Sequence, residues 1–333
     1  MKRISRSYPV ELIIAGVLVL VAGFIYFNRQ YLADTISVWQ YEPSQVMESL
    51  AKQGGLNSKG NFYLFAAKPT LLSSVDFSFH CSTKDASAAV LGCYKDDRIY
   101  IYNVENDKLE GIKTVTTAHE MLHVAYSRLS SADKDRINQL LEKEYAKLKN
   151  DTSFKERMEF YQKFEPGERD NELHSIVATE VKTIDPELEE YYSRYFDDRQ
   201  KVISHHDNYI TAFTSLQNKS DKLVKTLNSL ADSIKTRTKQ YNRSVSDFNQ
   251  RVANLNQRAN SNYFSSYSQY ETQKQALIAE SSQLSSTSRS INADIKKYNK
   301  LKTRLEKLGS QYEELTDSLD STIVESPDSI KAD

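Results

Sequence analysis

Long helices are the structure that the last third of the chain is built to form. Residues 207–321 contain no proline and a single glycine, Gly309. Proline and glycine end or weaken helices, so their scarcity permits an unusually long helical run. Apolar residues recur there at spacings of three, four and seven, which are the steps of a heptad repeat. The first series is Leu216, Leu223, Leu227, Leu230, Ile234, Tyr241, Val245, Phe248, Val252 and Leu255, and the second is Leu277, Leu284, Ile291, Ile295, Tyr298, Leu301, Leu305, Leu308, Tyr312, Leu315 and Leu319.

A largely polar break at residues 260–266 separates the two series. Two matched halves around such a break predict an antiparallel coiled-coil hairpin over 207–322. Each arm of about 45 residues would be ~65 Å long at a rise of 1.5 Å per residue. A single rod that dimerises in parallel is the alternative, so self-association or a coiled-coil partner is expected. The tail at 323–333 is expected to be disordered.

A second apolar run lies close to the N-terminus. Residues 12–27 are almost wholly apolar and, with their neighbours, approach the ~20 residues that a membrane-spanning helix needs. Three basic residues precede the run, and Arg29 is the main one after it. The positive-inside rule then predicts a cytoplasmic segment at 1–9, a transmembrane helix at 10–28 in the lipid bilayer of the cell membrane, and an extracytoplasmic remainder. The alternative is a cleaved signal peptide, but no A-x-A-like site ends the run. A juxtamembrane segment is expected at 29–60.

Composition limits the class of the remaining chain. Its 333 residues suggest about two domains. A net charge of −1 gives no general case for a nucleic-acid partner. Only 9 glycines and 6 prolines are present, which favours a largely helical protein. We therefore expect a mostly helical α+β fold.

The β component is predicted by short runs rich in β-branched and aromatic residues. These runs are 62–65, 75–79, 89–94 and 98–104. The tight connection Lys95-Asp96-Asp97 predicts that the last two form a hairpin. Together the runs predict a small antiparallel sheet that precedes the central helices.

The only two cysteines, Cys81 and Cys93, lie beyond the predicted membrane span. In an oxidising exterior they could form a disulfide that closes a short loop and contributes ~3 kcal/mol. Two free, buried thiols are the alternative. Their spacing is not that of a C-x-x-C metal site.

The motif that indicates chemistry is His119-Glu120-Met121-Leu122-His123, an H-E-x-x-H sequence. On a helix, histidines four residues apart lie on one face and can bind one zinc ion. The glutamate next to the first histidine can act on a water molecule at the metal. The alternative is a helix with two packed or surface histidines.

A small sheet followed by an H-E-x-x-H helix resembles the zincin metallopeptidases. Within them, the gluzincin group takes its third zinc ligand from a glutamate on a later helix, often just after an asparagine, and Asn171-Glu172 is similar to the start of that pattern. The resemblance implies a peptidase domain at 61–206. It further implies Zn²⁺ bound by His119, His123 and Glu172, with Glu120 as general base. The alternates for the third ligand are His174 and Glu180.

The family's pattern has an aspartate four positions after the glutamate, and Ile176 stands there instead. Thr179 or Glu180 is therefore the candidate for orienting the first histidine, His119. An oxyanion donor is sought among His174, Tyr126, Tyr161 and Tyr191. The strand at 98–104 is, by analogy with zincins, the expected ledge for an extended substrate.

The resemblance thus implies a membrane-anchored zinc metallopeptidase that hydrolyses an extracytoplasmic protein or peptide. The competing class is a non-enzymatic envelope scaffold in which the coiled coil binds partners and the histidine helix is structural or binds zinc without turnover. Hydrolysis of cell-wall peptides is a third candidate.

Overall fold

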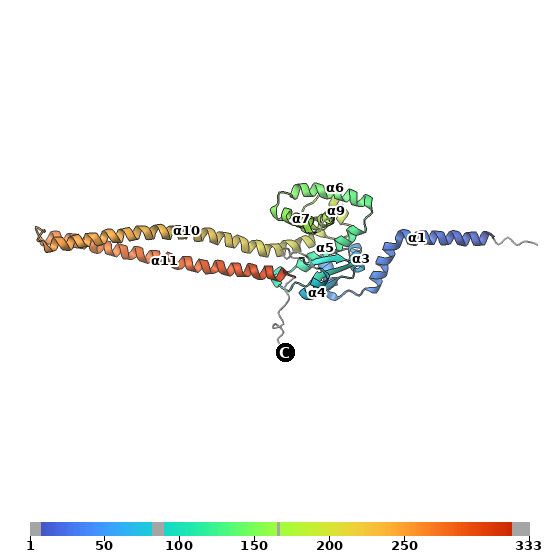
Figure 1. The fold of residues 1–333 in the computed structure, drawn as a ribbon, viewed down its shortest axis with the longest axis horizontal. Helices are drawn as coiled ribbons and strands as arrows, with labels where there is room; N and C mark the ends of the chain where they lie inside the picture. The colour runs from blue at the N-terminus through green and yellow to red at the C-terminus, as the bar shows by residue number, and fades with distance from the viewer. Residues whose placement is uncertain (1–7, 82–89, 165–166, 322–333) are drawn as a thin grey trace, which may run out of the picture. The chain divides into compact units, whose positions relative to one another are not determined.

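The computed structural model describes residues 8–81, 90–164 and 167–321 (Figure 1). It is mostly helical with one small sheet, in agreement with the predicted fold class. Most of the expected cytoplasmic segment, the turn expected between the cysteines and the tail at 323–333 lie outside the described residues. The chain divides into a head, which ends at Ala212 and resumes at Leu315, and an arm, Phe213–Glu314.

The head begins with α1 (Tyr8–Gln40), which is long and apolar enough to span a membrane. The apolar side chains of its first half are exposed. Its second half packs on the head, where the Ser37 hydroxyl donates a hydrogen bond to the Ala66 carbonyl at 2.7 Å and Asp34 is buried. One continuous helix therefore includes both the membrane-compatible segment and a contact with the head.

Two short helices follow, α2 (Gln45–Gln53) and α3 (Ser58–Ala66). The side chains of Ser44 and Asn57 cap their N-termini. Their buried residues, among them Leu64, belong to the main hydrophobic core. The segment expected to be a separate juxtamembrane region is therefore part of the head fold.

The sheet has the strand order β1-β3-β2, with β1 (Thr70–Leu72), β2 (Gly92–Lys95) and β3 (Arg98–Tyr102). The β2 and β3 strands pair antiparallel, as the hairpin prediction requires, and Asp96 and Asp97 adopt the positive φ that a tight hairpin turn needs. The β1 strand pairs parallel to β3, so the expectation of a purely antiparallel sheet is wrong.

Two predicted strands are helices. The run at 62–65 lies in α3, and the run at 75–79 lies in α4 (Ser74–His80). Side-chain caps at Asn57 and Ser73 start these helices, and burial of Leu64 and Phe77 then stabilises them. Capping and tertiary packing thus override the strand preference of the aromatic residues.

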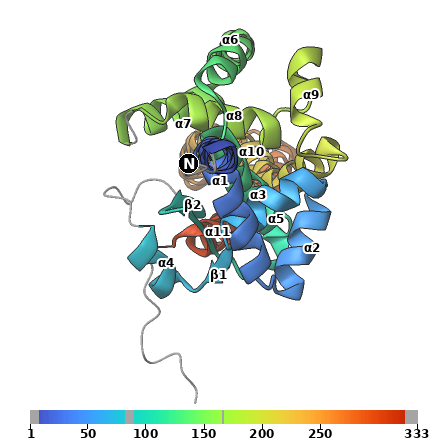
Figure 2. The same cartoon turned by 90° about the vertical axis from the view of Figure 1, so that its right-hand side faces the viewer.

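The centre of the head is α5 (Ile112–Ser127), which follows a short 3₁₀ turn, η1 (Asp107–Leu109), and is buried along most of its length. In Figure 2 the sheet with α2 and α3 lies on one side of α5. The other side is covered by α8 (Arg169–Glu180). Beyond it, α6 (Ser131–Leu148) and α7 (Thr152–Phe164) pack on α8, and α9 (Pro186–Tyr192) packs on α6. The α5–α8 contact brings two distant parts of the sequence together.

The arm consists of most of α10 (Arg199–Asn260) and α11 (Tyr267–Leu319). Ion pairs join Arg237 to Asp294 and Arg251 to Glu280. As the residue number on α10 rises, that of its partner on α11 falls, so the two helices run antiparallel. This favours the hairpin over a single rod. Its seam residues Leu227, Leu255, Ile291 and Leu308 are buried.

Candidate metal centre

Two histidines of α5 face one carboxylate of α8. Nε2 of His119 lies 3.3 Å from Oε2 of Glu172, and Nε2 of His123 lies 3.3 Å from Oε1 of the same residue. The ligand-type atoms of His119, Glu120 and His123 all lie within 4.8 Å of one another. Residues some fifty positions apart in the sequence therefore converge on one point.

These distances fit a zinc site. Ligands in a tetrahedral arrangement about 2.0–2.2 Å from zinc lie about 3.3–3.6 Å from each other. The 3.3 Å separations between the Glu172 oxygens and the two imidazole nitrogens are in that range. Oε2 of Glu172 is buried beside Nε2 of His119 and makes no hydrogen bond of normal geometry to the residues that the structure describes. Because burying a carboxylate oxygen without a good hydrogen bond is costly, a cation at this point would compensate it.

The charge of Glu172 is consistent with this role. Burial alone would raise the pKa of its carboxyl group. The nearby imidazoles of His123 and His119 and a hydrogen bond from Tyr161 outweigh that effect and hold the pKa below its ordinary value. The carboxylate is therefore ionised at neutral pH, which is the form that binds metal.

Asn171, next to Glu172, orients the second histidine. Its Oδ1 atom lies 3.0 Å from Nδ1 of His123, while its amide nitrogen donates to Glu168 at 3.0 Å. The amide oxygen thus faces the ring and can accept a hydrogen bond from Nδ1–H, a tautomer in which the Nε2 lone pair is available to a metal ion. The Ser175 hydroxyl lies 3.3 Å from the same Nδ1 atom.

The residues expected to orient a ligand histidine are engaged elsewhere. The Thr179 hydroxyl donates to the Ser175 carbonyl at 2.8 Å. Glu180 forms an ion pair with Arg157 and lies 3.5 Å from Nε2 of His206. Neither residue is therefore in place to orient His119, and the orienting contact that the structure describes, from Asn171, is to the second histidine, His123.

The alternate ligand His174 lies in a different environment from Glu172. It is fully buried, its Nε2 is 2.9 Å from the Tyr191 hydroxyl, and the rings of Tyr126 and Tyr192 pack around it. Burial lowers the pKa of His174 to about 3, so its imidazole is neutral. It does not line the cavity described next.

A cavity of about 660 Å³ opens beside the histidines. It is lined by His119, Glu120, His123, Glu172 and the strand β2. Of the four candidate oxyanion donors, Tyr161 alone lines it. The hydroxyls of Tyr126 and Tyr191 are used in contacts with Asn138 and His174.

The strand that borders the cavity is β2, not the expected β3. The β3 strand is central in the described sheet and is paired on both sides, so it has no open edge. The β2 strand is terminal in that sheet, and its residues from Gly92 to Lys95 line the cavity. A disulfide joins Cys93 of β2 to Cys81 at the end of α4, with their Cα atoms 5.9 Å apart.

Gly92 is a site residue that the sequence did not indicate. A Cβ atom at this position would lie 2.5 Å from Oε1 of Glu120 and 2.7 Å from the Thr116 methyl group. A side chain at 92 would therefore displace Glu120. Glycine lets the backbone of β2 approach the motif glutamate closely, and a lone glycine within a strand-like run was the available signal.

Comparisons with protein-family models, with curated protein sequences and with solved structures give no significant match.

Proposed function

We propose that the protein is a membrane-anchored zinc metallopeptidase of the gluzincin type, acting on an extracytoplasmic protein or peptide. The observation that supports this most strongly is the 3.3 Å spacing between the Glu172 carboxylate and the Nε2 atoms of both motif histidines. That spacing matches ligands around a tetrahedral zinc ion, and Glu120 lies beside them in a cavity.

The fit extends to the surroundings of the ligands. In the proposal, His119, His123 and Glu172 hold the ion, and Asn171 fixes the ring orientation of His123. A protein with three such ligands leaves a fourth position for water or substrate. When bound, zinc supplies a Lewis acid that polarises a carbonyl and lowers the pKa of water.

The remaining chemistry belongs to side chains of the chain itself. Glu120 takes the proton from the attacking water and passes it to the leaving amine. Tyr161 is the candidate oxyanion donor, because its side chain lines the cavity; its hydroxyl, which hydrogen-bonds Glu172, would turn to the developing oxyanion. The terminal strand β2 offers backbone groups to an extended peptide, which would add to the sheet edge.

The membrane attachment follows from α1. Its first half is apolar and exposed, and its second half packs on the head. With the N-terminus in the cytoplasm, as the basic residues before the helix predict, the head acts outside the cell membrane.

The test is cleavage of casein by the full chain in nonionic detergent, with its metal content measured in the same sample. Glu120→Gln removes the base and is expected to lower the cleavage rate by about 10²–10⁴-fold while zinc stays bound. Glu159→Gln, at an exposed position of α7, is the matched control and should cleave at the wild-type rate.

Zinc binding without any Glu120-dependent cleavage of casein or of a cell-wall digest would favour the scaffold function. If peptides are released from the cell-wall digest but casein is not cleaved, the substrate is a cell-wall peptide. Hydrolysis itself does not require the arm. The presence of the arm is therefore the observation that supports the scaffold function as the second candidate.

A further inference from the structure

The positive charge of the arm is concentrated in one section. Residues 219–243 of α10 hold seven Lys and Arg and two Asp, and residues 289–307 of α11 hold seven Lys and Arg against one Asp and one Glu. The antiparallel register set by the Arg237–Asp294 pair places these two segments along the same length of the hairpin. We call them together the basic section. Its net charge is +10, in a chain whose total is −1.

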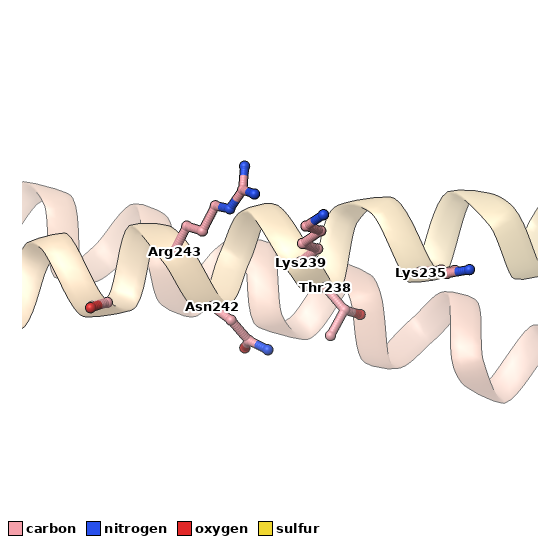
Figure 3. A pocket seen from close by; sticks show the side chains of 6 residues that line it. Lys235, Thr238, Lys239, Asn242 and Arg243 are labelled. Carbon is pink, nitrogen blue, oxygen red and sulfur yellow. The ribbon is translucent and has the colours of Figure 1, made fainter.

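The charge lies on the surface of the arm. Of the fourteen basic residues, all except Arg237 are exposed. Arg237 is paired with Asp294, whereas no described contact pairs Lys235, Lys239 or Arg243 with an acid. These three recur every four residues, so they form one stripe along α10. Figure 3 shows Lys239 and Arg243 pointing away from the neighbouring ribbon of α11.

A second stripe runs along α11. Its members recur at four, four and three residues and are all exposed: Lys296, Lys300, Arg304 and Lys307. The buried seam residue Ile291 lies on the other face of this helix, and Leu308 lies at the border of the stripe, one turn after Arg304. The two stripes therefore lie on different helices, outside the buried seam that joins them. Charges within a stripe recur about every 6 Å along the helix.

From this pattern we propose that the basic section binds a linear, phosphate-bearing polyanion outside the membrane, of a polymer type other than nucleic acid. A flexible chain can follow the stripes of both helices, whereas a flat bilayer surface meets one side of the arm. Several closely spaced cations would neutralise several phosphates and release their counterions, so binding would be strongly salt-dependent. The rest of the arm offers no such site, since 244–288 holds three basic and three acidic residues.

The test uses the full chain in nanodiscs of zwitterionic lipid and inorganic polyphosphate of defined length as the probe. Affinity is measured over a series of salt concentrations. We expect the triple variant Lys235→Gln, Lys239→Gln, Arg243→Gln to bind at least tenfold more weakly. Its log–log salt slope should be smaller by about two to three, or close to one per lost charge.

The matched control keeps the charge at the same three positions: Lys235→Arg, Lys239→Arg, Arg243→Lys. It should bind within twofold of the wild type. Equal affinity of the neutral and the charge-retaining variants, or binding that does not depend on salt, would overturn the proposal.

Two further probes separate the alternative partners. Vesicles with anionic lipid should compete poorly with polyphosphate, and single-stranded DNA of equal charge should bind no more tightly. Stronger binding of either would assign the section to a membrane surface or to nucleic acid and overturn the proposal. The inference is independent of the hydrolase, because Glu120→Gln should leave polyphosphate affinity unchanged.

Discussion

The head and the arm handle charge in opposite ways. In the head, charged and polar groups are buried at the centre, where Glu172, His123 and Glu120 are each at most 6% exposed. In the arm, a narrow apolar seam is buried, most charged residues are exposed and none is buried. Burying ionisable groups costs free energy unless a partner compensates it. The head therefore buries a cluster of ionisable groups beside its cavity, whereas the arm keeps most of its charge in solvent.

The largest effect is expected where a buried head charge loses its partner. Arg128 forms a two-pronged pair with Asp34 of α1, through Nε at 3.1 Å and Nη2 at 3.0 Å. Arg128→Ala leaves that buried carboxylate without its cation and should lower the free energy of unfolding of the head by about 3 kcal/mol. Denaturant unfolding followed by near-ultraviolet circular dichroism measures this, since the tyrosines Tyr191, Tyr192 and Tyr195 are buried in the head.

The matched variant in the arm is Arg237→Ala. Arg237 also pairs with one aspartate, but both side chains are about 30% exposed. We expect a loss below about 1 kcal/mol, because solvent screens the pair. Equal losses in the two variants would remove the contrast between head and arm.

The next effect sharpens the account of the head. Asn171→Ala removes the oxygen that faces Nδ1 of His123 and should weaken zinc binding by about 10–100-fold, because the ring loses its fixed orientation. Competition with a zinc chelator measures the affinity. Thr179→Ala, on the same helix but bonded to backbone, should keep the wild-type zinc affinity. If Thr179→Ala weakened zinc binding more than Asn171→Ala, the orienting role would belong to Thr179.

The smallest effect tests the position of β2. Gly92→Ala introduces a methyl group against Glu120 and should lower turnover by about tenfold while zinc binding is retained, since a small misplacement of a catalytic group is costly. The control is Gly309→Ala in the arm, where a Cβ atom meets nothing within 4 Å. Unchanged peptidase activity in Gly92→Ala would show that Glu120 tolerates a shifted strand.

The same contrast explains what the sequence could predict. The helices α10 and α11 form from a local apolar spacing that repeats along the chain, and the spacing alone predicts them. The hydropathy of α1 likewise predicts a segment able to span a membrane. In the head, the aromatic residues Phe62 and Phe79 predict strands locally. Both segments form helices, α3 and α4, because side-chain caps and burial outweigh that preference.

The same distinction applies to the candidate site. The H-E-x-x-H motif lies within one helix, so the sequence alone shows its spacing. The placement of Glu172 was an expectation from resemblance, whereas the contact of Asn171 with His123 and the approach of Gly92 to Glu120 depend on how α5, α8 and β2 pack. Such contacts between distant segments leave little trace in a single sequence.

The most direct test is the zinc content of the full chain after equilibration with zinc and removal of the excess ion. The wild type should hold one zinc per chain, Glu172→Ala should lose it, and Glu180→Gln should keep it, because Glu180 pairs with Arg157 instead. A wild type without zinc, or a Glu172→Ala variant that binds zinc as tightly as the wild type, would contradict the proposed metal centre.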